Sequence, residues 1–133
     1  MVAQFDKQRL SVYLQVIMLA LAASTIYSAP YLRQLFKTSL LDAFNLTELQ
    51  LGNLSSTYAI ACIICYLPGG WLADRVAPRI LVIIALFSSA ATFAWYATIP
   101  GYTELLIIYA LWGVIGVGIL WAAMFKQIRL LAG

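Results

Sequence analysis

Apolar residues are gathered into four long blocks, and charged residues are confined to the segments between and beside them. The blocks cover residues 10–31, 49–73, 80–99 and 105–125, and none of them contains Asp, Glu, Lys or Arg. A helix rises 1.5 Å per residue, so about 20 apolar residues cross a bilayer core that is about 30 Å thick. Every block is long enough. The pattern therefore predicts an all-α membrane protein with four membrane-crossing helices.

The segments between the blocks carry signals for where helices begin and end. Thr47 is followed three residues later by Gln50, which is typical of a capping box at the start of a helix. Pro78 suits the first turn of the third helix, and Pro100 breaks the chain before the fourth. The external loop 32–48 is longer and amphipathic. We expect it either to extend the first helix or to lie on the membrane surface.

Composition favours a membrane setting over a soluble one. Of the 133 residues, 64% are hydrophobic and 10% are charged, whereas a soluble domain has about 25% charged residues. The basic residues are scattered rather than gathered in a stripe, so we predict no nucleic-acid partner. Cys62 and Cys65 lie in an apolar block of a chain without histidine, which favours helix packing over metal or redox chemistry. We expect no cofactor, no metal and no enzymatic activity.

Basic residues fall unevenly on the two sides of the predicted membrane. Six lie on the side of the termini and two on the other side: Lys7, Arg9, Arg75, Arg79, Lys126 and Arg129 against Arg33 and Lys37. Loops rich in Lys and Arg stay in the cytoplasm. We therefore predict a multi-pass protein of the cell (inner or plasma) membrane, with both termini and the loop 74–79 in the cytoplasm.

The cytoplasmic loop carries a recognisable motif, GWLADRVAPR, over residues 70–79. It resembles the loop signature of the major facilitator superfamily, in which a glycine is followed by three residues, an aspartate, a basic residue and, after one residue, a second glycine with basic residues. Gly70, Asp74, Arg75 and Arg79 match, while Ala77 replaces the second glycine. The Asp-Arg-x-x-Pro-Arg form is similar to the organophosphate antiporter and anion symporter branch. The resemblance implies the N-terminal part of a twelve-helix transporter.

The resemblance also implies a role for the matching loop residues. In that family the aspartate latches the two halves of the transporter in the outward-facing state, which makes Gly70, Asp74, Arg75 and Arg79 a candidate latch. Gly70 permits close helix packing, and the dipole of the third helix favours the charge of Asp74. The arginines can pair with Asp74, with helix carbonyls or with lipid phosphates. A simple helix cap with positive-inside charges remains the alternative.

A substrate cavity is expected along the first and fourth helices, which line it in the superfamily. The few candidates there are Ser24, Thr25, Tyr27, Ser28, Arg33 and Trp112. The small polar residues share a helix face, although they could equally serve close helix approach. In the related branch an arginine of the first helix holds the substrate phosphate. Arg33, however, lies about 24 residues beyond Arg9, about 36 Å along a helix, so an exposed interface position is the alternative.

Together these features predict secondary transport of a small solute, such as an organic anion, a sugar or a sugar derivative. The expected partners are the lipid bilayer, the solute and the remaining transporter helices, because four helices cannot enclose a cavity between two halves. Gly113, Gly116 and Gly118 leave a small-residue face on the fourth helix, which we expect to receive a further helix. We therefore expect a truncated reading frame or a partial product.

Two other functions fit the pattern less well. A membrane scaffold or assembly subunit without transport activity would leave the loop motif unexplained. A four-helix multidrug exporter would need a carboxylate inside the membrane to exchange protons for cations, and none of the four blocks contains one.

Overall fold

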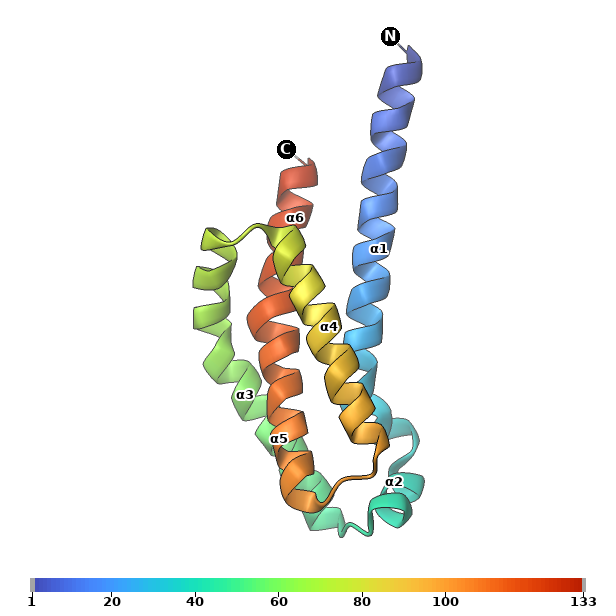
Figure 1. The fold of residues 1–133 in the computed structure, drawn as a ribbon, viewed down its shortest axis with the longest axis vertical. Helices are drawn as coiled ribbons and strands as arrows, with labels where there is room; N and C mark the ends of the chain where they lie inside the picture. The colour runs from blue at the N-terminus through green and yellow to red at the C-terminus, as the bar shows by residue number, and fades with distance from the viewer. Residues whose placement is uncertain (1, 133) are drawn as a thin grey trace.

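The computed structural model describes the backbone of residues 2–132 and the side chains of residues 10–130. Its helices are α1 (Val2–Leu35), α2 (Lys37–Phe44), α3 (Glu48–Arg75), α4 (Pro78–Ala97), α5 (Tyr102–Gly113), the π-helix η1 (Val114–Trp121) and α6 (Ala122–Ala132). No strand occurs in this part of the chain. The last three helices follow one another without a break and form one rod (Figure 1). The all-α prediction is confirmed.

Four stretches are long and apolar enough to cross a membrane: Leu10–Leu35, Glu48–Arg75, Pro78–Ala97 and Tyr102–Leu130. They match the four predicted crossings, so the chain is a multi-pass membrane protein. Half of the most apolar window of the last stretch is buried by the other helices, against 11%, 11% and 22% for the first three. The α5–η1–α6 rod is therefore the centre of the bundle, and the other helices present large apolar side chains outward, as lipid requires.

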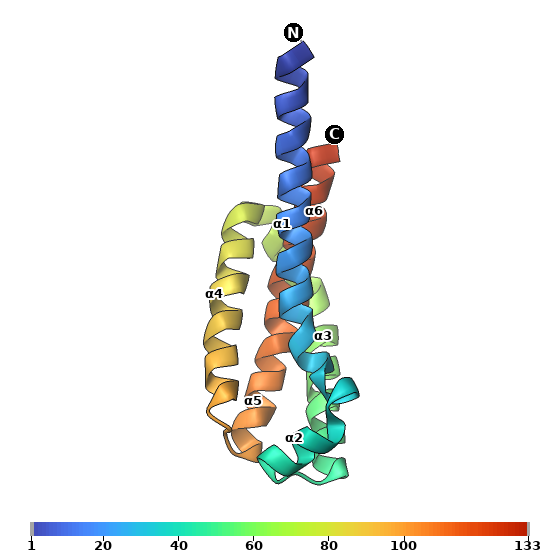
Figure 2. The ribbon, with the colours of Figure 1, turned by 90° about the vertical axis from the view of Figure 1, so that its right-hand side faces the viewer.

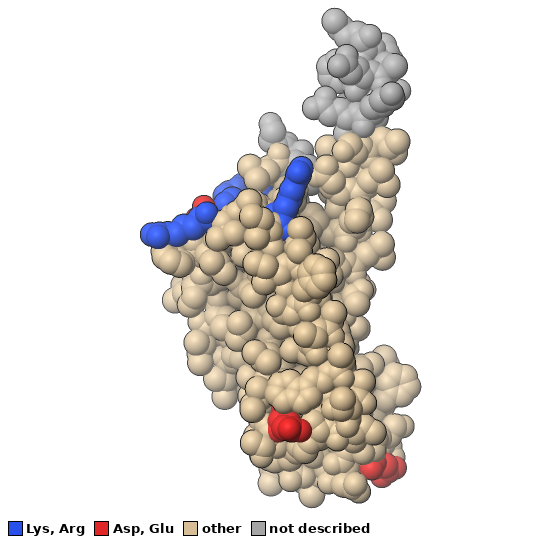
Figure 3. Space-filling view, in the orientation of Figure 1, with Lys and Arg blue, Asp and Glu red and all other residues tan. Residues whose placement is uncertain are grey.

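Successive crossings run in opposite directions (Figures 1 and 2). Both termini and the α3–α4 turn lie at one end of the bundle, while α2 and the α4–α5 turn lie at the other. On the face shown in Figure 3, basic side chains cluster at the end with the α3–α4 turn. The side chains of Lys7 and Arg9 lie outside the described residues. The side of the membrane that each end faces stays a prediction.

The helix ends follow the local chemistry. The predicted capping box is confirmed, because the Gln50 amide N–H donates to Thr47 Oγ1 at 3.2 Å and the Thr47 N–H donates to Gln50 Oε1 at 2.9 Å. Pro78 is the first residue of α4, as predicted. Within segment 32–48, α1 continues to Leu35, as one of the two alternatives predicted, and α2 then forms a separate short helix that ends at Phe44, before the left-handed Asn45. A position of α2 on the membrane surface stays a prediction.

Glycines set the distance between α3 and the central rod. A Cβ placed on Gly69 would lie 2.6 Å from the carbonyl oxygen of Gly118, and one on Gly113 would lie 2.7 Å from the Cβ of Ala61. Such contacts allow the two backbones to approach closely. A Cβ on Gly70, in contrast, would meet no atom of the described chain within 4 Å. Gly69 is thus the packing glycine within this bundle, not Gly70.

The small-residue face of the fourth crossing is covered from within the chain. α3 packs over Gly113 and Gly118, and the ring of Tyr27 from α1 covers Gly116. This corrects our expectation that these glycines receive a helix beyond the four. The expectation was wrong because a glycine face accepts any close neighbour, and the preceding helices already supply one.

Candidate functional site

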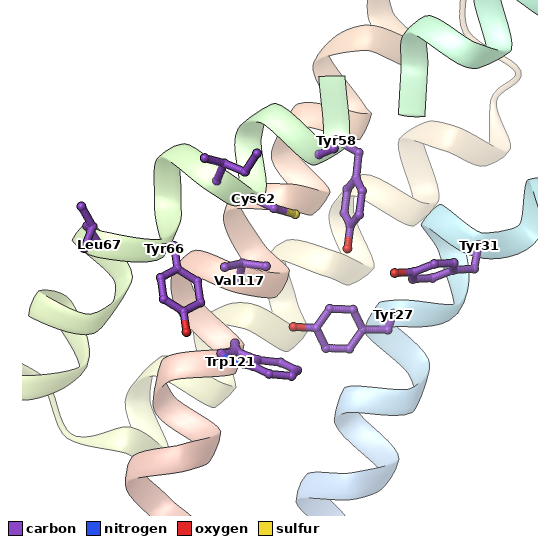
Figure 4. Close-up of a pocket in the computed structure, with 10 residues that line it drawn as sticks. Tyr27, Tyr31, Tyr58, Cys62, Tyr66, Leu67, Val117 and Trp121 are labelled. Carbon is purple, nitrogen blue, oxygen red and sulfur yellow. The ribbon is translucent and has the colours of Figure 1, made fainter. Parts of the chain in front are cut away.

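A cavity of about 700 Å³ opens between α1, α3 and η1 (Figure 4). Its lining is dominated by aromatic rings from three helices: Tyr27 and Tyr31 of α1, Tyr58, Ala59, Cys62, Ile63, Tyr66 and Leu67 of α3, and Val117 and Trp121 of η1. Figure 4 shows the labelled tyrosine side chains converging on the same space from α1 and α3. Three separate crossings therefore contribute side chains to the cavity.

Helical spacing explains why these side chains meet. Residues four apart lie on one face of a helix. The lining residues recur at that interval, in α1 at positions 27 and 31 and in α3 at positions 58, 62 and 66 and at positions 59, 63 and 67. The close approach of α3 to the rod, which the glycines allow, holds the lining residues of α3 beside η1. Local periodicity thus places the rings on the right face, and tertiary packing brings the faces together.

Tyr27 links two walls of the cavity. Its hydroxyl donates a hydrogen bond to the backbone carbonyl of Gly116, with an O···O distance of 2.9 Å. Its ring meets Trp121 edge to face, with 6.1 Å between the ring centroids. Glycine lets the ring approach closely, because a Cβ at position 116 would lie 3.2 Å from Cε1 of Tyr27 and the ring would have to give way slightly. The bond connects α1 with η1 across the cavity.

The lining offers aromatic faces and hydroxyl groups but no charged side chain. Tyrosine and tryptophan combine a large apolar face with a polar tip, which suits ligands that carry both C–H faces and hydroxyls. The described residues also contain no cluster of three or more His, Cys, Asp or Glu that could hold a metal ion. The cavity thus offers mainly apolar faces for packing, with a few hydroxyl groups for hydrogen bonds.

The structure separates the cavity candidates that the sequence suggested. Tyr27 lines the cavity, whereas Ser24, Thr25 and Ser28 are exposed and do not. Thr25 Oγ1 donates to the Leu21 carbonyl at 2.9 Å and Ser28 Oγ to the Thr25 carbonyl at 2.7 Å, so both hydroxyls serve their own helix. These serine and threonine side chains are small enough to bond back to α1 instead of reaching a neighbour.

Trp112 lies in the core instead of the cavity. Its side chain is 2% exposed, and its indole N–H donates to Thr92 Oγ1 of α4 at 3.1 Å. The rings of Phe93, Tyr96 and Tyr109 surround it, with centroid distances of 5.7, 5.1 and 4.9 Å. Trp112 therefore anchors the contact between α4 and α5 within the buried core.

Arg33 also lies outside the main cavity. It is half-buried near the end of α1, where it lines a smaller pocket of about 330 Å³ with Gln34, Lys37, Glu48, Leu51 and Gly52. Lys37 Nζ bonds Glu48 Oε1 at 2.8 Å, the only ion pair among the described residues. Arg33 thus lies near the end of α1 in a mixed-charge setting.

The four loop residues gather where α3 ends. Asp74, Arg75 and Arg79 are exposed there, and Asp74 pairs with neither arginine in the described structure. The guanidinium of Arg75 instead stacks on the ring of Trp71, 4.2 Å from its centroid. Gly70 and Asp74 line a pocket of about 510 Å³ together with α6 residues. The Asp74 carboxylate is left open to a partner.

Sequence reasoning missed two groups of residues. Tyr58, Cys62 and Tyr66 of α3 line the cavity, whereas the sequence predicted a cavity along the first and fourth helices alone. Their spacing of four within an apolar block was the available signal. Lys126 was noted only as a charge, yet its ammonium group donates to the carbonyls of Ala73 and Asp74 at the end of α3.

Comparison with known proteins places the chain in a family. The family model of the Major Facilitator Superfamily matches residues 10–133. The chain is similar to a D-galactonate transporter of Escherichia coli, with 35% identity over 75 residues, which is 55% of this chain and 17% of that protein. It is also similar to the inner membrane protein YihN of Escherichia coli, with 27% identity over 111 residues, 84% of this chain and 26% of that protein.

A third relative is an uncharacterized protein of Mycoplasma pneumoniae, 30% identical over 82 residues, 61% of this chain and 63% of that protein. The chain therefore spans less than two thirds of each of these relatives and about a quarter or less of the two from Escherichia coli. No solved structure matches the chain.

Proposed function

Because the chain belongs to the Major Facilitator Superfamily, we propose that it contributes the substrate cavity of a secondary transporter for a sugar acid or a similar hydroxylated organic anion. The observation that carries the proposal is the tyrosine-lined cavity between α1, α3 and η1. The similarity to a D-galactonate transporter supports the substrate class, because it comes from a relative named for such a solute.

The physical fit favours a polyhydroxylated solute. The cavity volume of about 700 Å³ is within the range of about 300–1,000 Å³ typical of small-molecule sites. Sugar C–H faces pack on aromatic rings, and the tyrosine hydroxyls can donate to a carboxylate or to sugar oxygens. Arg33, near the end of α1 that carries α2, is proposed to attract the anion towards the bundle. Its charge acts over a Debye length of about 8–10 Å in physiological salt.

Ligand binding tests this proposal directly. The 133-residue chain, purified in lipid nanodiscs, is titrated with D-galactonate by isothermal calorimetry. Saturable binding is expected, and Tyr58→Phe or Tyr66→Phe should weaken it about fivefold, the equivalent of one net hydrogen bond. Tyr13→Phe is the matched control, because Tyr13 is 65% exposed on α1 and does not line the cavity. The absence of saturable binding, or equal weakening by Tyr13→Phe, would show that the site is wrong.

We further propose that both termini and the α3–α4 turn are cytoplasmic. Six of the eight basic residues lie on that side of the predicted membrane, which supports the assignment. A membrane-impermeant maleimide tests it in intact cells. Asn45→Cys, in the turn after α2, should be labelled from outside, and Ala77→Cys should be labelled only after permeabilisation. The reverse pattern would overturn the orientation.

In the complete transporter, we propose that Asp74 acts as the latch residue and that Gly70 admits the partner helix. Support comes from the open pocket at Gly70 and from the carboxylate of Asp74, which has no ion-pair partner among the described residues. An interaction made in one state and broken in the other shifts the balance between them. Asp74→Asn should therefore reduce uptake by the complete protein more than it reduces solute binding, and an equal loss of both would contradict the latch.

A further inference from the structure

The segment η1 has an unusual backbone for the middle of a membrane-crossing helix. It runs as a π-helix over the eight residues Val114–Trp121, joined at both ends to α-helix. π-Helices are rare, mostly a single turn, and frequent at functional sites. Ile115 and Leu120 pack into the core, whereas Gly116 and Gly118 lack a side chain and expose the backbone to neighbouring helices. The conformation of η1 therefore depends on what contacts it.

Two neighbours reach the backbone of η1: α3 packs on Gly118, and Tyr27 of α1 bonds Gly116 from the other wall of the cavity. The Tyr27 hydroxyl donates to the Gly116 carbonyl at 2.9 Å, and its ring lies between Gly116 and the indole of Trp121. Trp121 in turn meets Phe125 of α6, with 5.0 Å between the ring centroids. A chain of contacts thus runs from α1 through η1 to the end of the rod that carries α6.

Tyr27 lines the cavity, and Figure 4 shows its hydroxyl directed into the space between the lining side chains. A hydroxyl inside a membrane needs an acceptor, and the Gly116 carbonyl is the one it has in the described structure. A carboxylate is a better acceptor than a carbonyl, since a hydrogen bond to a charged partner is roughly twice as strong. An anion in the cavity therefore competes for the same hydroxyl.

We propose that Tyr27 is a positioning residue that holds η1 in its π-helical form, and that the carboxylate of a cavity ligand captures the Tyr27 hydroxyl and releases η1. The second part of this inference, release by a ligand carboxylate, rests on the proposed function. Release lets η1 shift towards α-helical register, and each residue of register turns the following segment by about 100°. Trp121, Phe125 and the α6 residue Lys126, which caps α3, then change their orientation together. Binding in the cavity is thereby transmitted to the end of the bundle where α3 meets α4.

Hydrogen–deuterium exchange of the 133-residue chain in nanodiscs tests the inference. The amides of Val117–Phe125 are followed in the wild type, in Tyr27→Phe and in the control Tyr13→Phe, each with and without D-galactonate. Without ligand, Tyr27→Phe should exchange about fivefold faster than the wild type, because one net hydrogen bond is lost. D-Galactonate should raise the wild-type and Tyr13→Phe rates in the same amides and leave the Tyr27→Phe rate unchanged.

A second variant changes the acceptor residue of the hydrogen bond between Tyr27 and Gly116. In Gly116→Ala, the new Cβ would lie 3.2 Å from Tyr27 Cε1, so the ring has to shift and its bond to the position 116 carbonyl is strained; the same amides should exchange faster while helix content stays unchanged. Unchanged exchange in both variants would overturn the role of Tyr27 whether or not D-galactonate binds. A ligand that binds by calorimetry without altering wild-type exchange would overturn the release step. A ligand that fails to bind refutes the proposed substrate class, and the two variants then decide the role of Tyr27 alone.

Discussion

The neighbouring glycines Gly69 and Gly70 allow a sharp test of how α3 packs on the central rod. Both lie in the same turn of the same helix, so an alanine changes helix propensity equally at the two positions, by up to about 1 kcal/mol in favour of the helix. Only their surroundings differ. Gly69 is buried against Gly118, whereas Gly70 faces open space.

The size of the effect follows from the contact distances. In Gly69→Ala, the new Cβ would lie 2.6 Å from the Gly118 carbonyl oxygen and 2.9 Å from its Cα. Ordinary contact begins at 3.4 Å, so the oxygen has to move by about 0.8 Å. Both atoms belong to the backbone, so α3 and η1 must separate rather than a side chain rotate. Overpacking of this kind costs about 1–3 kcal/mol.

The assay is reversible unfolding of the chain in mixed detergent micelles, followed by far-UV circular dichroism. Gly70→Ala should be at least as stable as the wild type, and Gly69→Ala should be less stable than Gly70→Ala by about 1–3 kcal/mol. Because the propensity gain cancels in this difference, the result reports the steric clash alone. Equal stability of the two variants, within about 0.5 kcal/mol, would refute the backbone contact that positions the cavity.

Three further predictions concern other parts of the bundle. Ile99 has a φ of 53°, which is strained for a β-branched residue, so Ile99→Gly should raise the unfolding free energy by about 1 kcal/mol in the same assay. Thr92→Val leaves the buried N–H of Trp112 without its acceptor and should cost about 1–3 kcal/mol, while Thr92→Ser should cost less. Lys126→Met removes the cap on the Ala73 carbonyl, so hydrogen exchange should accelerate at the end of α3 and not at its start; uniform exchange would contradict the cap.

The parts of the fold that were predictable from the sequence depend on local chemistry. The length of an apolar block decides whether it crosses a membrane, and Thr47 with Gln50 can form a capping box wherever the rest of the chain lies. The extension of α1 to Leu35 was one of two alternatives that the sequence left open, and the π-helical form of η1 was not predicted. The form of η1 depends on packing against other helices, which the order of residues along one helix does not display.

The candidate site was predictable only in part, for the same reason. Polarity drew attention to Thr25 and Ser28, but a short hydroxyl side chain in a membrane bonds most easily to its own helix. Trp112 and Tyr27 look alike in sequence, since each is an aromatic residue within a crossing. The partner decides between them: Thr92 holds Trp112 in the core, and Gly116 holds Tyr27 at the cavity.

The face pattern of α3 connects the packing of the bundle with the width of its cavity. Two rows run along this helix with residues four apart, one row large and one row small. The large row holds Tyr58 and Tyr66 with Cys62 between them, and the small row holds only small residues, Ala61, Cys65 and Gly69. The small row contacts Gly113 and Gly118 of the rod, while the large row lines the cavity. Since the rows are three residues apart and so adjacent on the helix, the depth to which the small row packs sets how far the tyrosines stand from Tyr27. A larger residue in the small row should therefore widen the cavity and weaken ligand binding without any change to a lining side chain.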